Sequence, residues 1–169
     1  MHTSGNRFSS PPYALFYLLA FTGINAVGAA LGGAATSTSV GTWYATLEKP
    51  GFTPPAWVFG PAWTLLYLLL AISAWLIWRQ NSKNIAVKQA LCAYFAQLGL
   101  NFLWSPLFFG LRSPLLGFID ILLLLIAIGW MLRRFLQVSL MATLLSIPYL
   151  AWVLFATALN FEIMRLNWQ

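Results

Sequence analysis

The sequence predicts an all-α membrane protein, a bundle of five transmembrane helices with a long first loop. Hydrophobic residues make up 60% of the chain, charged residues only 7%, and the mean hydropathy is +0.77, whereas a soluble domain is typically about a quarter charged. The apolar residues gather in five runs of about the 20 residues that a spanning helix needs. Strands of a membrane barrel would alternate apolar and polar side chains, and the run from Ile121 to Ile126 does not.

The five predicted helices cover residues 13–35, 57–78, 90–109, 115–132 and 139–164. Helices are expected because lipid cannot satisfy the hydrogen-bonding groups of an extended backbone. We expect residues 1–12, which carry serines and two prolines, to form a flexible tail, and residues 13–169 to form one membrane domain. Pro106 and Pro148 fall inside the third and fifth helices and should kink or loosen them.

The first helix contains Gly28 and Gly32, a G-x-x-x-G spacing that lets two helix backbones approach closely. This spacing serves either packing inside the bundle or dimerisation. The first loop, residues 36–56, is the longest connection and holds Trp43, Tyr44 and Phe52 together with three prolines that stiffen it. Such a loop is either an aromatic belt at the membrane surface or a cap over a cavity.

The basic residues predict the orientation of the bundle. On one side of the membrane the sequence places Arg7, Arg79, Lys83, Lys88, Arg133 and Arg134, and on the other side Lys49, Arg112 and Arg165. Because basic residues favour the cytoplasmic side, this bias predicts a cytoplasmic N-terminus. The same scattering argues against a nucleic-acid partner despite the net charge of +6, since no basic patch forms.

Three helices carry aromatic and neutral polar side chains at helical spacing, so each set occupies one face. The sets are Phe59, Trp63 and Tyr67 on the second helix, Gln97, Asn101, Trp104 and Phe108 on the third, and Tyr149, Trp152, Ala156 and Asn160 on the fifth. Polar groups in membrane helices turn away from lipid, so these faces should meet. They form either a packed core with interhelical amide bonds or a cavity whose tryptophans stack a flat ligand.

Residues able to hold a metal are scarce. His2 is the single histidine and lies in the predicted tail, and Cys92 is the single cysteine. We therefore expect no metal site and no required cofactor. Asp120 is an acid just inside the fourth helix, where it either favours the positive end of the helix dipole or acts functionally as an intramembrane carboxylate.

Three motifs resemble signatures of the translocator protein family, also called TspO/MBR. They are the loop segment from Trp43 to Pro55 with the second-helix face that follows it, the third-helix segment Gln97 to Gly110, and the fifth-helix segment Pro148 to Asn160. The resemblance implies a five-helix bundle, commonly a homodimer, that binds porphyrins such as protoporphyrin IX and haem, as well as sterols and synthetic drugs of the benzodiazepine-receptor class. Phe161 stands near the place of a tyrosine in the animal cholesterol motif, which argues against cholesterol recognition.

By motif position, the resemblance and the faces above give eleven candidate ligand-binding residues. They are Trp43, Phe59, Trp63, Tyr67, Asn101, Trp104, Tyr149, Trp152, Phe155, Ala156 and Leu159. In some bacterial members that the chain resembles, porphyrin is degraded in light, and the tryptophans implicated there look like Trp63 and Trp152. The last segment of the chain looks more like bacterial than animal members, so we expect a bacterial cell membrane. The remaining alternatives are a light-dependent porphyrin-degrading enzyme and a stress-response regulator acting through a partner protein.

Overall fold

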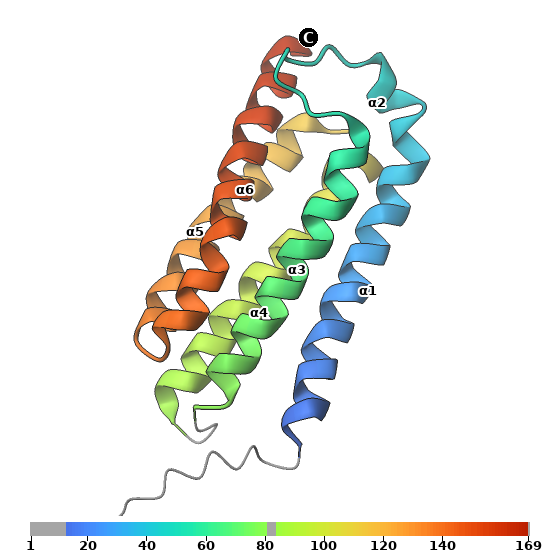
Figure 1. The fold of residues 1–169 in the computed structure, drawn as a ribbon. Coiled ribbons are helices and arrows are strands. Elements are labelled where there is room, and N and C mark those ends of the chain that lie inside the picture. Colours follow the sequence, from blue (N-terminus) through green and yellow to red (C-terminus); the bar gives the residue numbers. More distant parts are fainter. Residues whose placement is uncertain (1–12, 81–83, 169) are drawn as a thin grey trace, which may run out of the picture.

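The computed structural model describes residues 13–80 and 84–168, and this part of the chain contains helices and no strand (Figure 1). The predicted tail, residues 1–12, and Lys83 lie outside the described residues. The elements are α1 (Ala14–Val40), α2 (Trp43–Thr46), α3 (Ala56–Trp78), α4 (Ile85–Ser105), the π-helix η1 (Pro106–Gly110), α5 (Pro114–Leu136) and α6 (Leu140–Leu166). The five long helices run side by side, as the short connections predict.

Four of these helices, α1, α3, α5 and α6, are long and apolar enough to cross a membrane. The chain is therefore an integral membrane protein. The fifth long helix, α4, has 21 residues and packs against α5 and α3. It is less apolar because it carries polar residues such as Gln97 and Asn101, both of which are buried within the bundle.

The two halves of the bundle are packed differently. The half near the α3–α4 and α5–α6 connections is solid: Leu70, Tyr94, Ile128, Met131 and Phe135 have no exposed surface. The half near α2 and the C-terminus has a smaller buried cluster around Phe108 and Phe109, which α2 covers. Any large cavity must therefore lie in the second half.

The G-x-x-x-G spacing of α1 is used inside the bundle. A Cβ atom at Gly28 would lie 1.8 Å from the ring of Phe102 on α4, so that ring fills the space a side chain would occupy. One turn later, the hydroxyl of Ser105 donates to the carbonyl of Gly32 over 3.0 Å. Of the two roles that the sequence leaves open, the structure assigns these glycines to helix packing.

Two predicted boundaries are wrong by five residues. α1 continues to Val40, five residues beyond the predicted end, and the first loop is correspondingly shorter and contains α2. Residues 36–39 (TSTS) read as loop, yet the hydroxyl of Thr36 donates to the carbonyl of Gly32 over 2.7 Å, and that of Ser39 donates to the carbonyl of Phe109 over 3.0 Å. α4 begins at Ile85 and not at residue 90, because the side chain of Asn84 caps it by accepting from the backbone N–H of Ala86.

The two prolines act differently. At Pro106 the α-helix gives way to the five-residue π-helix η1, so the third predicted helix is interrupted as expected. This wider turn buries Phe108 and Phe109. α6, in contrast, remains helical through Pro148.

Candidate functional site

A cavity of about 840 Å³ lies in the half of the bundle near α2. α1, α3, α4 and α6 supply most of its wall, with contributions from η1, α5 and the first loop. Along α3 the lining extends from Ala56 to Tyr67, a length of about 16 Å at 1.5 Å per residue. The volume lies within the range of about 300–1,000 Å³ that is usual for pockets that bind small molecules.

Aromatic rings form the inner wall of the cavity. The ring of Trp63 stacks on Tyr67 with centroids 5.3 Å apart, and it meets Trp152 edge to face at 6.4 Å. Phe59 also meets Trp152 edge to face, at 5.9 Å. These contacts join α3 to α6 and hold the rings in fixed orientations, so the wall is preformed for a flat apolar ligand.

The tryptophans differ in what their ring nitrogens can offer. The Trp104 ring stacks on Phe108 at 5.0 Å, and its N–H donates to the Oδ1 of Asn160 over 3.1 Å. Among the described residues, the ring nitrogens of Trp63 and Trp152 have no partner, and neither is sealed inside the protein. Trp104 is thus held in place as part of the cavity wall, whereas Trp63 and Trp152 each have a ring N–H that is free to donate to a ligand.

A chain of hydrogen bonds continues behind the wall. Tyr67 donates its hydroxyl to the Oδ1 of Asn101, and the Nδ2 of Asn101 donates to the hydroxyl of Tyr149 over 3.0 Å. Tyr149 in turn donates to the Oε1 of Gln97 over 2.8 Å. The two interpretations that the sequence offers for these faces are therefore both realised: the amides bond across helices, and a cavity lies in front of them.

Eight of the eleven predicted residues line the cavity. They are Phe59, Trp63, Tyr67, Asn101, Trp104, Trp152, Ala156 and Leu159. The other three lie behind it: Trp43 packs on Phe108 at 5.8 Å, Tyr149 is fully buried beneath Trp63, and Phe155 lies between Trp152 and Phe52 of the loop. These three can affect a ligand only through their neighbours in the structure described.

The wall formed by α1 was not predicted. It consists mainly of small residues, including Gly28, Ala29, Gly32 and Gly33; the ring of Phe102 fills the space beside Gly28, whereas the space beside Gly33 is open. The signal was present in the sequence as a glycine-rich stretch, but it predicts close packing equally well. Lys49 of the first loop also lines the cavity and was not among the predicted residues.

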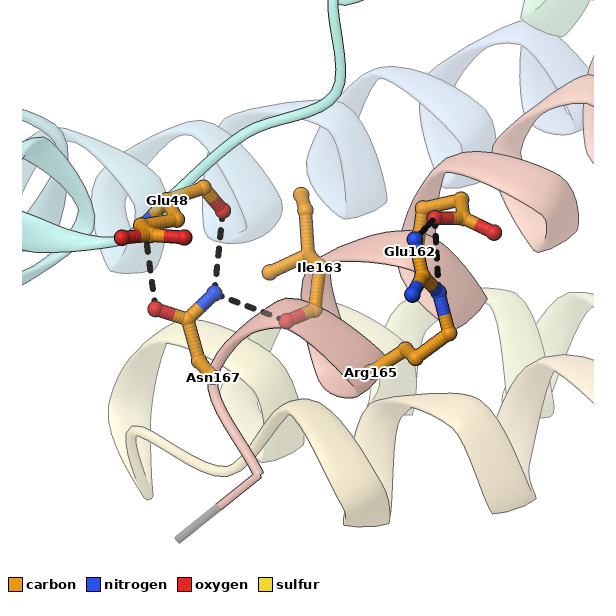
Figure 2. Close-up of polar contacts among 5 residues, drawn as sticks. All are labelled: Glu48, Glu162, Ile163, Arg165 and Asn167. Atoms are coloured by element: carbon orange, nitrogen blue, oxygen red, sulfur yellow. Dashed lines mark hydrogen bonds and ion pairs between the residues drawn. The ribbon is translucent and has the colours of Figure 1, made fainter.

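The first loop is fastened to the end of α6 by Asn167, as Figure 2 shows. The backbone N–H of Glu48 donates to the Oδ1 of Asn167 over 3.0 Å, and the Nδ2 of Asn167 donates to the carbonyl of Glu48 over 2.9 Å. The same Nδ2 also donates to the carbonyl of Ile163 over 2.8 Å. Together with the contact between Phe52 and Phe155, this pair holds the loop across the end of the bundle. The loop therefore covers the cavity end, as one of the two predicted roles requires.

Asp120 lies apart from this cavity. Its side chain is 3% exposed, and its Oδ2 has no hydrogen-bond partner among the described residues. α5 begins at Pro114, so Asp120 lies beyond the first turn, where interaction with the helix dipole is already weak. Of the two roles that the sequence leaves open for this acid, interaction with the helix dipole is therefore the weaker.

The comparison with known proteins identifies the family. The model of the TspO/MBR family matches residues 20–166. The chain belongs to the TspO/MBR family. It is 53% identical to the tryptophan-rich protein TspO of Archaeoglobus fulgidus over 132 residues, covering 78% of this chain and 84% of that protein. It is 39% identical both to the tryptophan-rich sensory protein of Cereibacter sphaeroides (75% and 78% covered) and to the human translocator protein (74% and 75% covered).

Proposed function

We propose that this member of the TspO/MBR family is a membrane receptor or transport-like protein that binds tetrapyrroles, protoporphyrin IX or haem, in the aromatic cavity. The observation that carries the proposal is the set of rings around Trp63 and Trp152, which line a cavity of about 840 Å³. A tetrapyrrole is a flat, largely apolar ring system, and such a ligand gains most from stacking on aromatic faces.

The proposed binding mode uses no axial ligand to iron. Among the described residues that line the cavity there is no histidine, cysteine or methionine; of the two tyrosines, Tyr67 donates its hydroxyl to Asn101 and the ring of Tyr44 lies beneath the ammonium of Lys49. Stacking depends on the ring system and not on its metal. Metal-free protoporphyrin IX should therefore bind about as tightly as haem.

The experiment is a titration of both compounds into lipid nanodiscs that contain the protein, followed by the porphyrin absorbance band, with empty nanodiscs as the control. Saturable binding of both, with dissociation constants within about threefold of each other, supports the proposal. If the porphyrin absorbance with protein-containing nanodiscs is the same as with empty nanodiscs, the proposal is contradicted. A strong preference for haem that a single Met, Tyr or Cys substitution removes would replace stacking with iron coordination.

A second candidate is a light-dependent porphyrin-degrading enzyme in which Trp63 and Trp152 act as electron or radical partners. The observation in its favour is that these two rings are adjacent, at 6.4 Å, and that both line the cavity. Loss of porphyrin absorbance in light but not in darkness distinguishes the enzyme from the receptor. A third candidate, a stress-response regulator, is distinguished by capture of a partner protein that depends on porphyrin.

We further propose that α4 also crosses the bilayer, which gives five transmembrane helices in a bacterial cell membrane with the N-terminus in the cytoplasm. Its 21 residues are long enough to span, and η1 lengthens it at the cavity end.

The protein would act as a homodimer. Because Gly28 and Gly32 pack within the bundle, the dimer would use another surface. Sterols are less suited as ligands, since Phe161 stands near the place of the tyrosine in the animal cholesterol motif.

A further inference from the structure

The cavity has one charged side chain in its wall as far as the described residues show, and this side chain is Lys49. The rest of the lining is aromatic, aliphatic, glycine or neutral polar. In ligand pockets lined mostly by apolar side chains, a few placed polar or charged groups fix the orientation of the ligand and provide specificity. A single cation in an otherwise neutral wall gives the cavity one end that differs chemically from all its other surfaces.

Lys49 is held in place but is not neutralised. Its ammonium donates to the carbonyl of Leu47 over 2.9 Å and lies 4.8 Å above the ring of Tyr44. It forms no ion pair within the described chain, where the one ion pair joins Arg165 to Glu162. An ammonium has three N–H donors, so two remain for an acceptor in the cavity.

The surroundings of Lys49 keep its charge isolated. Burial raises the pKa of the Tyr44 hydroxyl above its ordinary value, so this ring stays neutral beside the ammonium. The hydroxyls of Thr53 and Ser37, which also line the cavity, donate to the carbonyls of Pro50 and Ala34. The loop end of the cavity is thus polar and positive, whereas the inner wall around Trp63 is aromatic.

The position of Lys49 is fixed by its neighbour. Glu48 is bonded through both its backbone N–H and its carbonyl to Asn167, and Pro50 restricts the backbone on the other side (Figure 2). The ammonium is therefore presented by a constrained segment, which lowers the entropy lost when it binds an anion.

We propose that Lys49 makes the cavity selective for flat apolar ligands that carry a carboxylate, by forming a charge-assisted hydrogen bond with that carboxylate at the loop end. This inference rests on the proposed function and deepens it. The aromatic wall takes the ring system, and Lys49 recognises the acid group. Hydrogen bonds between an ammonium and a carboxylate are roughly twice as strong as neutral ones. An ester of the same ring system keeps the stacking and loses this bond.

The test compares protoporphyrin IX with its dimethyl ester in nanodiscs of phosphatidylcholine, a lipid without net charge. The unmodified protein should bind the diacid about tenfold more tightly than the diester. Lys49→Met should weaken the diacid about tenfold and leave the diester unchanged, and Lys49→Arg should keep the preference. Arg165→Gln is the matched control, because it removes a cation at the same end of the bundle outside the cavity lining, and it should change neither affinity.

The outcomes separate this inference from the proposed function. If the unmodified protein binds diacid and diester equally and Lys49→Met changes nothing, the selectivity is overturned while the cavity still binds porphyrin. If Arg165→Gln reduces diacid binding as much as Lys49→Met, general surface charge and not Lys49 is responsible. If neither compound binds above empty nanodiscs, both proposals fail. Unchanged binding of the diester by Lys49→Met also shows that the variant is folded.

Discussion

The three tryptophans that line the cavity make different contacts, which their residue type alone does not predict. Trp104 donates its ring N–H to Asn160 and stacks one face on Phe108, so less of this side chain remains for a ligand. Trp63 and Trp152 keep their ring nitrogens free within the described structure. A ligand should therefore depend more on Trp63 and Trp152 than on Trp104.

Gly28 offers a prediction about packing at a single residue. A Cβ atom there would lie within 1.9 Å of two atoms of the Phe102 ring, so Gly28→Ala must displace that ring or separate α1 from α4. Overpacking of this kind costs about 1–3 kcal/mol. We expect a lower midpoint of thermal unfolding in detergent.

Gly33→Ala is the matched control for this change. Gly33 is on the same helix, but a Cβ atom there would have no neighbour within 4 Å. Because alanine also favours a helix over glycine, the midpoint should stay equal or rise. Equal losses in the two variants would show that the close contact of Gly28 with Phe102 is not what matters.

At the scale of elements, the first loop is joined to α6 at two places. Asn167 bonds the backbone of Glu48, and Phe52 contacts Phe155. The loop leads directly into α3, and both α3 and α6 line the cavity. The connection therefore joins these two walls of the cavity at their ends. Breaking this connection should shorten the residence time of a bound ligand more than it changes the orientation of that ligand.

Asn167→Ala tests this connection. The variant loses two exposed hydrogen bonds to the loop, each of which stabilises the contact by no more than about 1.5 kcal/mol. We expect protoporphyrin IX to dissociate about threefold to tenfold faster, and amide hydrogen exchange at residues 47–53 to increase without ligand. Arg165→Gln breaks the 2.7 Å ion pair with Glu162 on the same helix end and does not touch the loop (Figure 2), so it should change neither quantity. Unchanged exchange in Asn167→Ala would mean that the aromatic contacts alone hold the loop.

For the whole molecule, the basic residues and the antiparallel helices together predict the topology. Arg79 directly follows α3, Lys88 lies in the first turn of α4, and Arg133 and Arg134 lie in the last turn of α5. These helix ends are at the end of the bundle opposite α2 (Figure 1). The excess of basic residues there predicts that this end faces the cytoplasm. The cavity end, with Lys49, would then face the outside.

Cysteine labelling of the two ends of α4 tests both the orientation and the fifth span. Gln80→Cys and Leu111→Cys flank α4, both positions are exposed, and Cys92→Ser removes the native thiol. In intact cells an impermeant maleimide should label residue 111 and reach residue 80 only after permeabilisation. Labelling of both from one side would show that α4 does not cross, and the reverse pattern would invert the orientation.

The sequence predicts the helical bundle and the inner wall well, and the loop end poorly. Trp63, Asn101 and Trp152 could be found because helical spacing places each on a face with other ring or amide groups, and because motifs mark them. Lys49 lies inside the loop motif and Asn167 lies outside all three motifs, but neither was predicted as a site residue, since their roles depend on how a loop meets the end of α6 in space. The resemblance implied that Trp43 covers the cavity and contacts the ligand, but α2 turns its ring onto Phe108.

The central claim is that stacking on the aromatic wall holds the ligand, and Trp152 tests it most directly. Trp152→Ala should weaken protoporphyrin IX binding by about 1–3 kcal/mol, by analogy with bases stacked on aromatic side chains. Trp152→Phe keeps a ring and should stay within a few-fold of the unmodified protein. Trp130→Ala, a tryptophan on the outer face of α5 that is 40% exposed, is the control and should have no effect. The account predicts this order of affinities in nanodisc titrations; a Trp152→Ala variant that is folded and binds with unchanged affinity would contradict it.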